Sequence, residues 1–458
     1  MPKGLISPIF GVNDDSFARL FSMIRTFSIA AFLVFFQGAY LFSQNIFPQI
    51  SNTARLFVHA QTSSYLSPQI KLGIDVLADQ NFFPLLGKRV GLLTHPAGVN
   101  RLGISTVRIL YQNKSVNLVA LFGPEHGIYG NEKANEPIDN ATDPRTGLPV
   151  YSLYGKYRKP TSEMLSGLDV LVIDLQDIGT RSYTYISCMK LTLEAAFENR
   201  VEVIILDRPN PLGGIKVDGP PMDNQWKSYV GAFNIPYVHG LTIGELARMA
   251  VSIPGVLDIP DSTRRAGKLT VVTMDGWRRY MSWPSLGLKW IAPSPNIPDF
   301  PAAVGYAMTG LGAQIGNFKH GIGSEYPFRI LTHKNASLDQ LEAELKRRLI
   351  PGLSFERKSF QNGAQTGLYV KVEDWSTWNP TELSFHMMQI TAQFDFSNPF
   401  ASATSNRGEL FNKHVGSSSW WREITQKGAN ANRMGFVVAW QRQAKQFQIQ
   451  SSSYWLYE

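Results

Sequence analysis

Four short apolar runs with helical patterns between them most constrain how this chain can fold. Residues 89–94, 116–121, 170–174 and 203–206 are rich in Val, Leu and Ile, and turn signals bound each run. Strands that alternate with helices usually build a parallel sheet with helices packed on it. The sequence therefore predicts an α/β fold with a parallel sheet in its N-terminal part.

Polar and titratable side chains follow three of these runs directly. The segments read FGPEHG at 122–127, QDIGTRSYTY at 176–185 and DRPNP at 207–211. Ligands of open α/β sheets bind in the crevice beyond the carboxyl ends of the strands. We therefore predict one converging site at these strand ends. Its ionisable candidates are Glu125, His126, Asp174, Asp177, Arg181, Asp207, Arg208, His239 and Glu245.

This set of side chains suits glycoside hydrolysis, which usually needs a carboxylic acid and a second carboxylate on either side of the scissile bond. Aromatic and amide side chains in the same segments, such as Tyr183 and Gln176, suit a polyhydroxylated ligand. Structural roles stay open for two of the acids. Glu125 could cap a helix, and Glu245 completes a capping-box pattern that begins at Thr242.

Other chemistries lack their usual spacing. A metal site is the main rival, because His95, His126, His239 and Asp177 are plausible ligands, but the chain has no HxH or HExxH motif. A serine hydrolase would need a GxSxG motif, which is absent. The single cysteine, Cys188, is expected to be a buried thiol in a helix. No glycine-rich phosphate loop follows the first strand, so the fold implies no nucleotide cofactor.

The positive charge of the chain is diffuse. The formal net charge is +8 and the pI is about 9.3, but Lys and Arg form only short pairs. This distribution does not predict nucleic-acid binding, which favours clustered basic residues. It is compatible with an anionic polymer outside the cell. The sequence does not specify an oligomeric state.

The N-terminal segment has the features of a secretory signal. Arg25 precedes the apolar stretch 27–36, as expected of the basic and apolar parts of such a signal. We assign residues 1–60 to a signal or membrane-anchor segment with a linker. Cleavage would leave a secreted or envelope-located chain that begins between about Ala39 and Gln61, whereas retention would leave a membrane anchor.

Two folded regions are expected after this segment. Prolines and glycines cluster at 252–268, so we place a catalytic domain at 67–253 and a C-terminal α/β domain at 254–458. The C-terminal domain should complete the cleft of the first. Aromatic residues in the tail at 431–457 are expected to be core, with a sugar-binding platform as the alternative.

The motifs resemble those of the NamZ-type exo-β-N-acetylmuramidases, a bacterial family formerly catalogued as a domain of unknown function. The resemblance extends from about Gly73 to the C-terminus. The matching stretches are Gly91–Asn100, Phe122–Gly127, Thr146–Tyr154, Asp174–Tyr185, Leu206–Gly214, His239–Ala247, Pro293–Pro298 and Phe411–Lys413.

The resemblance implies a Rossmann-like N-terminal domain, a smaller C-terminal domain and an active site between them. It also implies removal of N-acetylmuramic acid from the non-reducing ends of peptidoglycan fragments or muropeptides, with no cofactor. Glu125 matches the glutamate of the family's PEHG motif, which implies a catalytic role. Asp177 and Glu245 are the candidates for the second carboxylate. The expected substrate-binding residues are His126, Gln176, Arg181, Tyr183, Asp207, Arg208, Asn210, His239, Asn296 and Gln314.

The sequence departs from the family motifs at one place. Gln314 stands where family members usually carry a glutamate, and Ile322 stands where they usually carry an arginine. A carboxylate and a cation are thereby lost. The alternative hypothesis is therefore a catalytically weakened protein that binds peptidoglycan or sugar.

Overall fold

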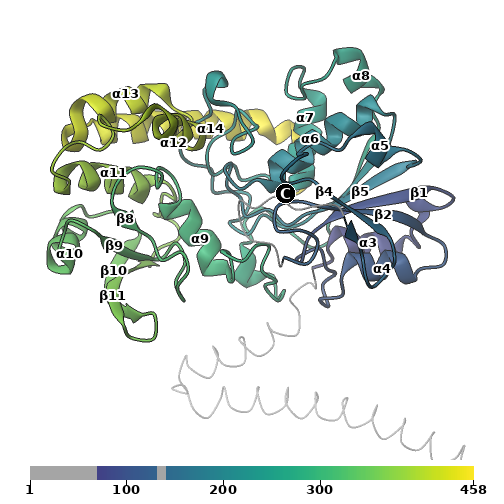
Figure 1. The fold of residues 1–458 in the computed structure, drawn as a ribbon, viewed down its shortest axis with the longest axis horizontal. Helices are drawn as coiled ribbons and strands as arrows, with labels where there is room; N and C mark the ends of the chain where they lie inside the picture. The colour runs from purple at the N-terminus through teal and green to yellow at the C-terminus, as the bar shows by residue number, and fades with distance from the viewer. Residues whose placement is uncertain (1–69, 131–140) are drawn as a thin grey trace, which may run out of the picture. The chain divides into compact units, whose positions relative to one another are not determined.

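The computed structural model describes residues 70–130 and 141–458 (Figure 1). A seven-stranded sheet forms its N-terminal part, in the order β3-β4-β2-β1-β5-β6-β7. All neighbouring strands are parallel except β3 and β4. The strands are β1 (Arg89–Thr94), β2 (Asn117–Gly123), β3 (Ala141–Thr142), β4 (Pro149–Ser152), β5 (Val170–Asp174), β6 (Glu202–Leu206) and β7 (Leu269–Val272). The predicted α/β class is confirmed.

The strand order reverses at β1. The chain runs from β1 outward through β2 to β4, returns to the other side of β1 at β5, and continues to β6 and β7. Thr94 at the end of β1 is in register with Asp174 at the end of β5. Such a switch point leaves a crevice beyond the carboxyl ends of the two strands.

Helices cover both faces of this sheet (Figure 1). Alternate residues of β5 enter two separate cores: Leu171 and Ile173 pack with α6 and α7, whereas Val170 and Val172 pack with α3 and α4. Burial on both faces explains why these strands are apolar at nearly every position. The helices are α3 (Gly73–Asp79), α4 (Thr106–Gln112), α5 (Ser162–Leu165), α6 (Tyr185–Glu198), α7 (Ile243–Ser252) and α8 (Asp261–Ala266).

The C-terminal part contains a four-stranded sheet in the order β10-β11-β9-β8, whose neighbours are all antiparallel. Its strands are β8 (Phe318–Lys319), β9 (Ile330–His333), β10 (Leu353–Phe360) and β11 (Gln365–Val372). Its helices are α9 (Phe300–Thr309), α10 (Leu338–Arg347), α11 (Glu382–Phe394), α12 (Ser405–Val415), α13 (Ser418–Lys427) and α14 (Arg433–Ser451). The short 3₁₀ helices of both parts are η1 (Phe83–Leu85), η2 (Asn224–Trp226), η3 (Trp283–Ser285), η4 (Gly428–Asn430) and η5 (Ser452–Tyr454).

The first sheet continues past the domain boundary that we placed at 253/254. Strand β7 pairs in parallel with β6, so residues 269–272 belong to the N-terminal sheet. The Pro- and Gly-rich stretch before β7 includes α8, which packs on α6. This stretch is therefore a crossover between neighbouring strands, a position where turn residues are also common.

The C-terminal tail returns to the N-terminal sheet and is part of the core. The Tyr457 hydroxyl donates to Oδ2 of Asp207 at 2.6 Å and accepts from the Met274 amide at 3.0 Å. Trp440 is also buried, 5% exposed, in the C-terminal core. Trp440 and Tyr457 are thus core residues as expected, whereas Phe447, Tyr454 and Trp455 are only partly buried against the core.

No helix within residues 70–130 and 141–458 is long and apolar enough to cross a membrane. The apolar stretch 27–36 and the whole segment 1–60 lie outside the described residues, so its assignment as a signal or anchor stays a prediction.

We expect Tyr457→Phe to lower the free energy of unfolding by about 2 kcal/mol, because it removes a buried hydrogen bond to a carboxylate. Urea unfolding measures this loss. Tyr280→Phe is the control, since the Tyr280 side chain is 70% exposed. Equal stability of the two variants would show that the tail does not depend on this bond.

The loss should also depend on pH. Burial raises the pKa of Asp207 to about 6 from its ordinary 3.8. Its protonated form therefore contributes stability that is complete below pH 3.8 and is lost as the pH rises through about 6. The Tyr457 hydroxyl favours the ionised carboxylate, so its removal should cost more above pH 6 than below pH 4. Urea unfolding of the unmodified protein and of Tyr457→Phe below pH 4 and above pH 6 tests whether the loss increases with pH.

Candidate active site

Glu125 lies just beyond the end of β2 and is half-buried. The Thr184 hydroxyl, at the start of α6, donates to its Oε2 at 3.1 Å. His126 adopts a φ of +73°, in the left-handed region that costs energy for a residue with a side chain. This turn directs the chain away from the sheet and leaves the Glu125 carboxylate next to the first turn of α6.

Asp177 follows β5 and supplies a second carboxylate. The Gly179 amide donates to its Oδ2 at 2.7 Å, and Nε2 of His239 lies 3.3 Å from the same oxygen. The Leu241 amide donates to Nδ1 of His239, so the ring proton is on Nε2, facing Asp177. Oδ1 of Asp177 is buried and has no hydrogen-bond partner within the described residues. Asp177 is therefore held at one oxygen and available at the other.

Tyr306, from α9 of the C-terminal part, is close enough to both carboxylates for their charges to act on its phenol. Burial raises its pKa to about 12, and the negative charges of Glu125 and Asp177 contribute to the increase. Its hydroxyl is 3.0 Å from the Ser182 hydroxyl. Its ring lies 6.1 Å from that of Tyr183, next to Thr184, which binds Glu125. Both predicted acids therefore act on an aromatic residue that the sequence analysis did not identify.

Tyr183 and Tyr185 extend this aromatic surface. Their rings pack edge to face at 4.8 Å, and the Tyr183 hydroxyl is buried without a hydrogen-bond partner among the described residues. Burial raises the pKa of both phenols well above the ordinary value. Both hydroxyls are therefore neutral over the working pH range of proteins, and the Tyr183 hydroxyl lies close to the side chains of Tyr185 and Ser294.

His95 has a structural role at this site. The Gln176 amide donates to its Nε2 at 2.8 Å, so the ring proton is on Nδ1, which lies 3.3 Å from the Pro293 carbonyl. Burial lowers the pKa of His95 to about 3, so the ring is neutral. The Tyr185 hydroxyl also donates to the Pro293 carbonyl, at 2.7 Å. His95 thus fixes the proline-rich loop against the end of β5.

Both ring nitrogens of His95 contact protein groups, so His95 is not available as a metal ligand. Within residues 70–130 and 141–458, no group of three or more His, Cys, Asp or Glu side chains is arranged to hold a metal ion. Cys188 is fully buried, as predicted, and burial raises its pKa to about 12.

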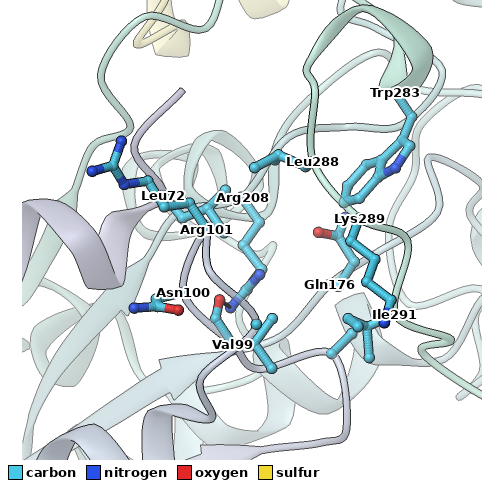
Figure 2. A pocket seen from close by; sticks show the side chains of 12 residues that line it. Leu72, Val99, Asn100, Arg101, Gln176, Arg208, Trp283, Leu288, Lys289 and Ile291 are labelled. Atoms are coloured by element: carbon cyan, nitrogen blue, oxygen red, sulfur yellow. Dashed lines mark hydrogen bonds between the residues drawn. The ribbon is translucent and has the colours of Figure 1, made fainter. Parts of the chain in front are cut away.

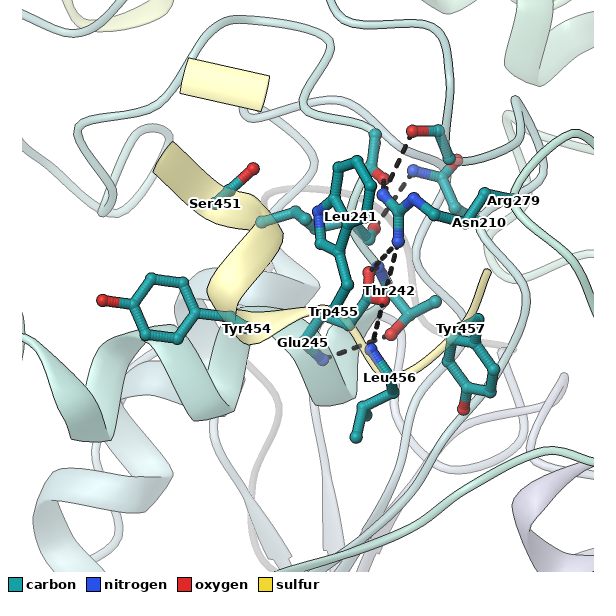
Figure 3. Close-up of polar contacts among 12 residues, drawn as sticks. Asn210, Leu241, Thr242, Glu245, Arg279, Ser451, Tyr454, Trp455, Leu456 and Tyr457 are labelled. Carbon is teal, nitrogen blue, oxygen red and sulfur yellow. Dashed lines mark hydrogen bonds and ion pairs between the residues drawn. The ribbon is translucent and has the colours of Figure 1, made fainter. Parts of the chain in front are cut away.

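Glu245 is a structural residue (Figure 3). Its carboxylate accepts from the Thr242 amide at 3.0 Å, from Nη1 of Arg279 at 2.7 and 2.9 Å, and from the Leu456 amide at 2.9 Å. The side chain is fully buried. The capping-box role is therefore confirmed, and the contacts do not favour a catalytic role for Glu245, because both of its oxygens are occupied by protein donors.

Arg181 is also structural. Its guanidinium donates to four backbone carbonyls at 2.6 to 3.1 Å. Two of them, Pro220 and Ile235, lie in the N-terminal part, and the other two, His414 and Val415, lie at the end of α12. Burial lowers the pKa of Arg181 to about 10, which leaves it charged at neutral pH. It joins the two parts of the protein, so our prediction that it contacts substrate finds no support in its contacts.

Asp207 and Asn210 hold the loop after β6. Asp207 accepts from the Thr242 hydroxyl and the Gly244 amide as well as from Tyr457. Asn210 donates to the Leu241 carbonyl and accepts from the Leu212 amide. Their side chains are buried and engaged with the protein, so the structure favours positioning roles for both.

Gln176 and Arg208 line a pocket beyond the ends of β5 and β6 (Figure 2). Arg208 binds Asp174 with two nitrogens, Nε at 2.5 Å and Nη2 at 3.1 Å. Loop 97–103 and loop 283–291 form the other walls. The sequence analysis missed the second loop, because it lies about 80 residues beyond β6 and carries no motif.

Two predicted substrate contacts lie further along the chain. Asn296 is half-buried in the loop whose Pro293 contacts His95. Gln314 follows α9, and its Oε1 is buried without a hydrogen-bond partner among the described residues. Substrate binding by these two residues, and by His126, which is buried beside Glu125, stays a prediction.

Comparison with known proteins identifies the family. The N-terminal model of the exo-beta-N-acetylmuramidase NamZ family matches residues 90–301, and its C-terminal model matches residues 304–457. The chain belongs to the NamZ exo-β-N-acetylmuramidase family. The border between the two matches falls after β7, in agreement with the strand pairing.

Individual relatives agree with this assignment. The peptidoglycan beta-N-acetylmuramidase NamZ of Bacillus subtilis (strain 168) is 42% identical over 293 residues, which are 64% of this chain and 68% of that protein. Crystal structures of two DUF1343 family proteins from Bacteroides fragilis NCTC 9343 are similar, with TM-scores of 0.75 and 0.63 and identities of 40% and 26%. Each match covers 85% of this chain and 99% of the other.

We expect Glu245→Gln to destabilise the fold by about 3 kcal/mol, because it leaves the buried Arg279 cation without its counter-charge. Chemical denaturation measures the loss, and Glu163→Gln, at an exposed position on α5, is the control. A Glu245→Gln protein with normal stability and no activity would return Glu245 to the catalytic mechanism.

Proposed function

We propose that this protein releases N-acetylmuramic acid from the non-reducing ends of peptidoglycan fragments. The observation that carries the proposal is the convergence of Glu125 and Asp177 on one aromatic region in a member of a muramidase family. The Bacillus subtilis relative is named as a peptidoglycan hydrolase of this bond type. Two carboxyl groups are the pair that most glycoside hydrolases use.

Glu125 is the proposed general acid/base. Its carboxylate is half-buried and bonded to the Thr184 hydroxyl, so it retains access to a ligand. Asp177 is the proposed second carboxylate, which would stabilise or attack the developing oxocarbenium ion, or activate water. Its Oδ2 is fixed by the Gly179 amide beside His239, which leaves Oδ1 for the reaction. The Tyr183 hydroxyl would donate to the sugar.

Glu125→Gln should lower kcat about a hundred- to ten-thousand-fold, because it removes a positioned proton donor. Asp177→Asn should have a comparable effect, since it removes the charge of the second carboxylate. The measurement is release of a chromogenic aglycone from its β-N-acetylmuraminide. Gln112→Glu, at an exposed position on α4, controls for a change of charge at the surface. A folded Glu125→Gln protein with near-normal turnover would remove Glu125 from the mechanism.

The alternative, a sugar-binding protein with weakened catalysis, rests on Gln314. Its buried Oε1 has no hydrogen-bond partner in the described part of the chain, and the residue follows α9, the helix that supplies Tyr306. The same chromogenic substrate separates the two functions. Turnover by the unmodified protein supports the enzyme, whereas saturable binding without release supports the alternative.

We further propose that the protein acts outside the cytoplasm, in the envelope or beyond it, because its substrate is located there and the segment around Arg25 has the pattern of an export signal. Terminal sequencing of the protein from its native host should find a start between about Ala39 and Gln61, or an intact anchor in the membrane fraction. A soluble cytoplasmic form with residues 23–60 intact would contradict export.

A further inference from the structure

The pocket beyond the ends of β5 and β6 contains polar groups that the proposed hydrolysis does not use. It opens between loop 97–103 and loop 283–291, and Figure 2 shows Gln176 and Arg208 between side chains of both loops. Apolar side chains from Trp283, Leu288 and Ile291 form one wall. No acidic residue lines it.

Gln176 presents an acceptor to this pocket. Its Nε2 donates both protons to backbone carbonyls, of Asp177 at 2.8 Å and of Pro209 at 2.9 Å. These two bonds fix the orientation of the amide, because the opposite orientation would place oxygen against oxygen. Oε1 is buried without a hydrogen-bond partner among the described residues, and the whole residue is 2% exposed. An unpaired buried acceptor is costly, so a ligand donor at this position would be favoured.

Arg208 presents a cation to the same space. Its Nε and Nη2 bind Asp174, and Nη2 also donates to the Val99 carbonyl at 2.5 Å. The structure gives Nη1 no hydrogen-bond partner within the described residues, and this nitrogen lies on the other side of the guanidinium. Arg208 is only 3% exposed, so its charge acts in a weakly screened environment.

Lys289 adds an exposed cation at the rim. It has no ion-pair partner within the described residues. Arg101 also lines the pocket, and Asp174, behind Arg208, neutralises one of these three cations, so the lining retains a net positive charge next to the Gln176 oxygen. A guanidinium and an ammonium suit a carboxylate, and the glutamine oxygen suits an N–H or O–H next to it.

We propose that this pocket is a binding site for a carboxylate that is adjacent to a hydrogen-bond donor. Gln176 accepts the donor, Arg208 and Lys289 hold the carboxylate, and the apolar wall contacts the carbon skeleton. If the proposed function holds, two parts of a peptidoglycan fragment carry this chemistry. They are the lactyl carboxylate of N-acetylmuramic acid and the carboxyl end of a stem peptide.

The test is isothermal titration of the full-length protein with N-acetylmuramic acid and with D-alanyl-D-alanine. N-acetylglucosamine, which lacks the carboxylate, is the reference sugar. We expect one or both acids to bind, more weakly at high salt, and N-acetylglucosamine to bind at least about tenfold more weakly than N-acetylmuramic acid if the lactyl group is the occupant. The acid that binds identifies the source.

Two variants localise the binding. Lys289→Glu should raise the dissociation constant about three- to tenfold, since it reverses a rim charge. Lys445→Glu, at an exposed position on α14, is the matched control and should leave the constant unchanged. Gln176→Met should weaken binding about tenfold by removing the acceptor.

Gln176→Met also removes two hydrogen bonds to backbone carbonyls. If that variant does not fold, the comparison of Lys289→Glu with Lys445→Glu decides the matter. The proposal is overturned if neither acid binds, or if binding is the same in the Lys289→Glu and Lys445→Glu proteins. Release of the chromogenic aglycone is measured separately. Turnover in a protein whose acid binding does not depend on Lys289 would reject the pocket and keep the proposed hydrolysis. Acid binding that depends on Lys289 without any turnover would keep the pocket and reject the proposed hydrolysis.

Discussion

The parallel pairing of β1 with β5 is the constraint on which the rest of the structure depends. It places the end of β1 in register with the end of β5 at the point where the strand order reverses. The His95 ring follows the first strand and accepts from the Gln176 amide, which follows the second. A shift of one residue would turn every side chain of β5 to the opposite face. The site and the two cores therefore depend on the same register.

Buried polar groups, rather than apolar contacts alone, hold the loops at these strand ends. Arg208 pairs with Asp174, Arg279 pairs with Glu245, and Arg181 donates to four backbone carbonyls. Such pairs contribute little net stability compared with apolar packing, but the loss of one partner is costly. Their effect here is geometric. Each fixes a loop that would otherwise have several conformations, and the loops carry the residues of the candidate site.

The strands and the main acids could be predicted from sequence, because local patterns encode them. Apolar runs specify β1, β2, β5 and β6, and motifs at their ends locate Glu125 and Asp177. The capping-box pattern offered a structural role for Glu245, but it did not exclude the catalytic role that we also expected. Other features depend on distant partners. The bond between Arg279 and Glu245 spans 34 residues, and Tyr306 enters the site from a helix with no motif of its own. A sequence pattern cannot distinguish a buried arginine that binds carbonyls from one that binds substrate.

The two family matches meet between residues 301 and 304, yet the contacts that shape the site cross this border. Tyr306 reaches Ser182 from the C-terminal side, and Arg181 reaches Val415 from the N-terminal side. Tyr457, from the C-terminal tail, donates to Asp207, which directly precedes Arg208 at the end of β6. Removal of either part would therefore expose buried hydrogen-bonding groups of the other and displace Tyr306 from the carboxylates. Because the carboxylates come from one part and their aromatic neighbour from the other, catalysis and folding of this chain are properties of both parts together.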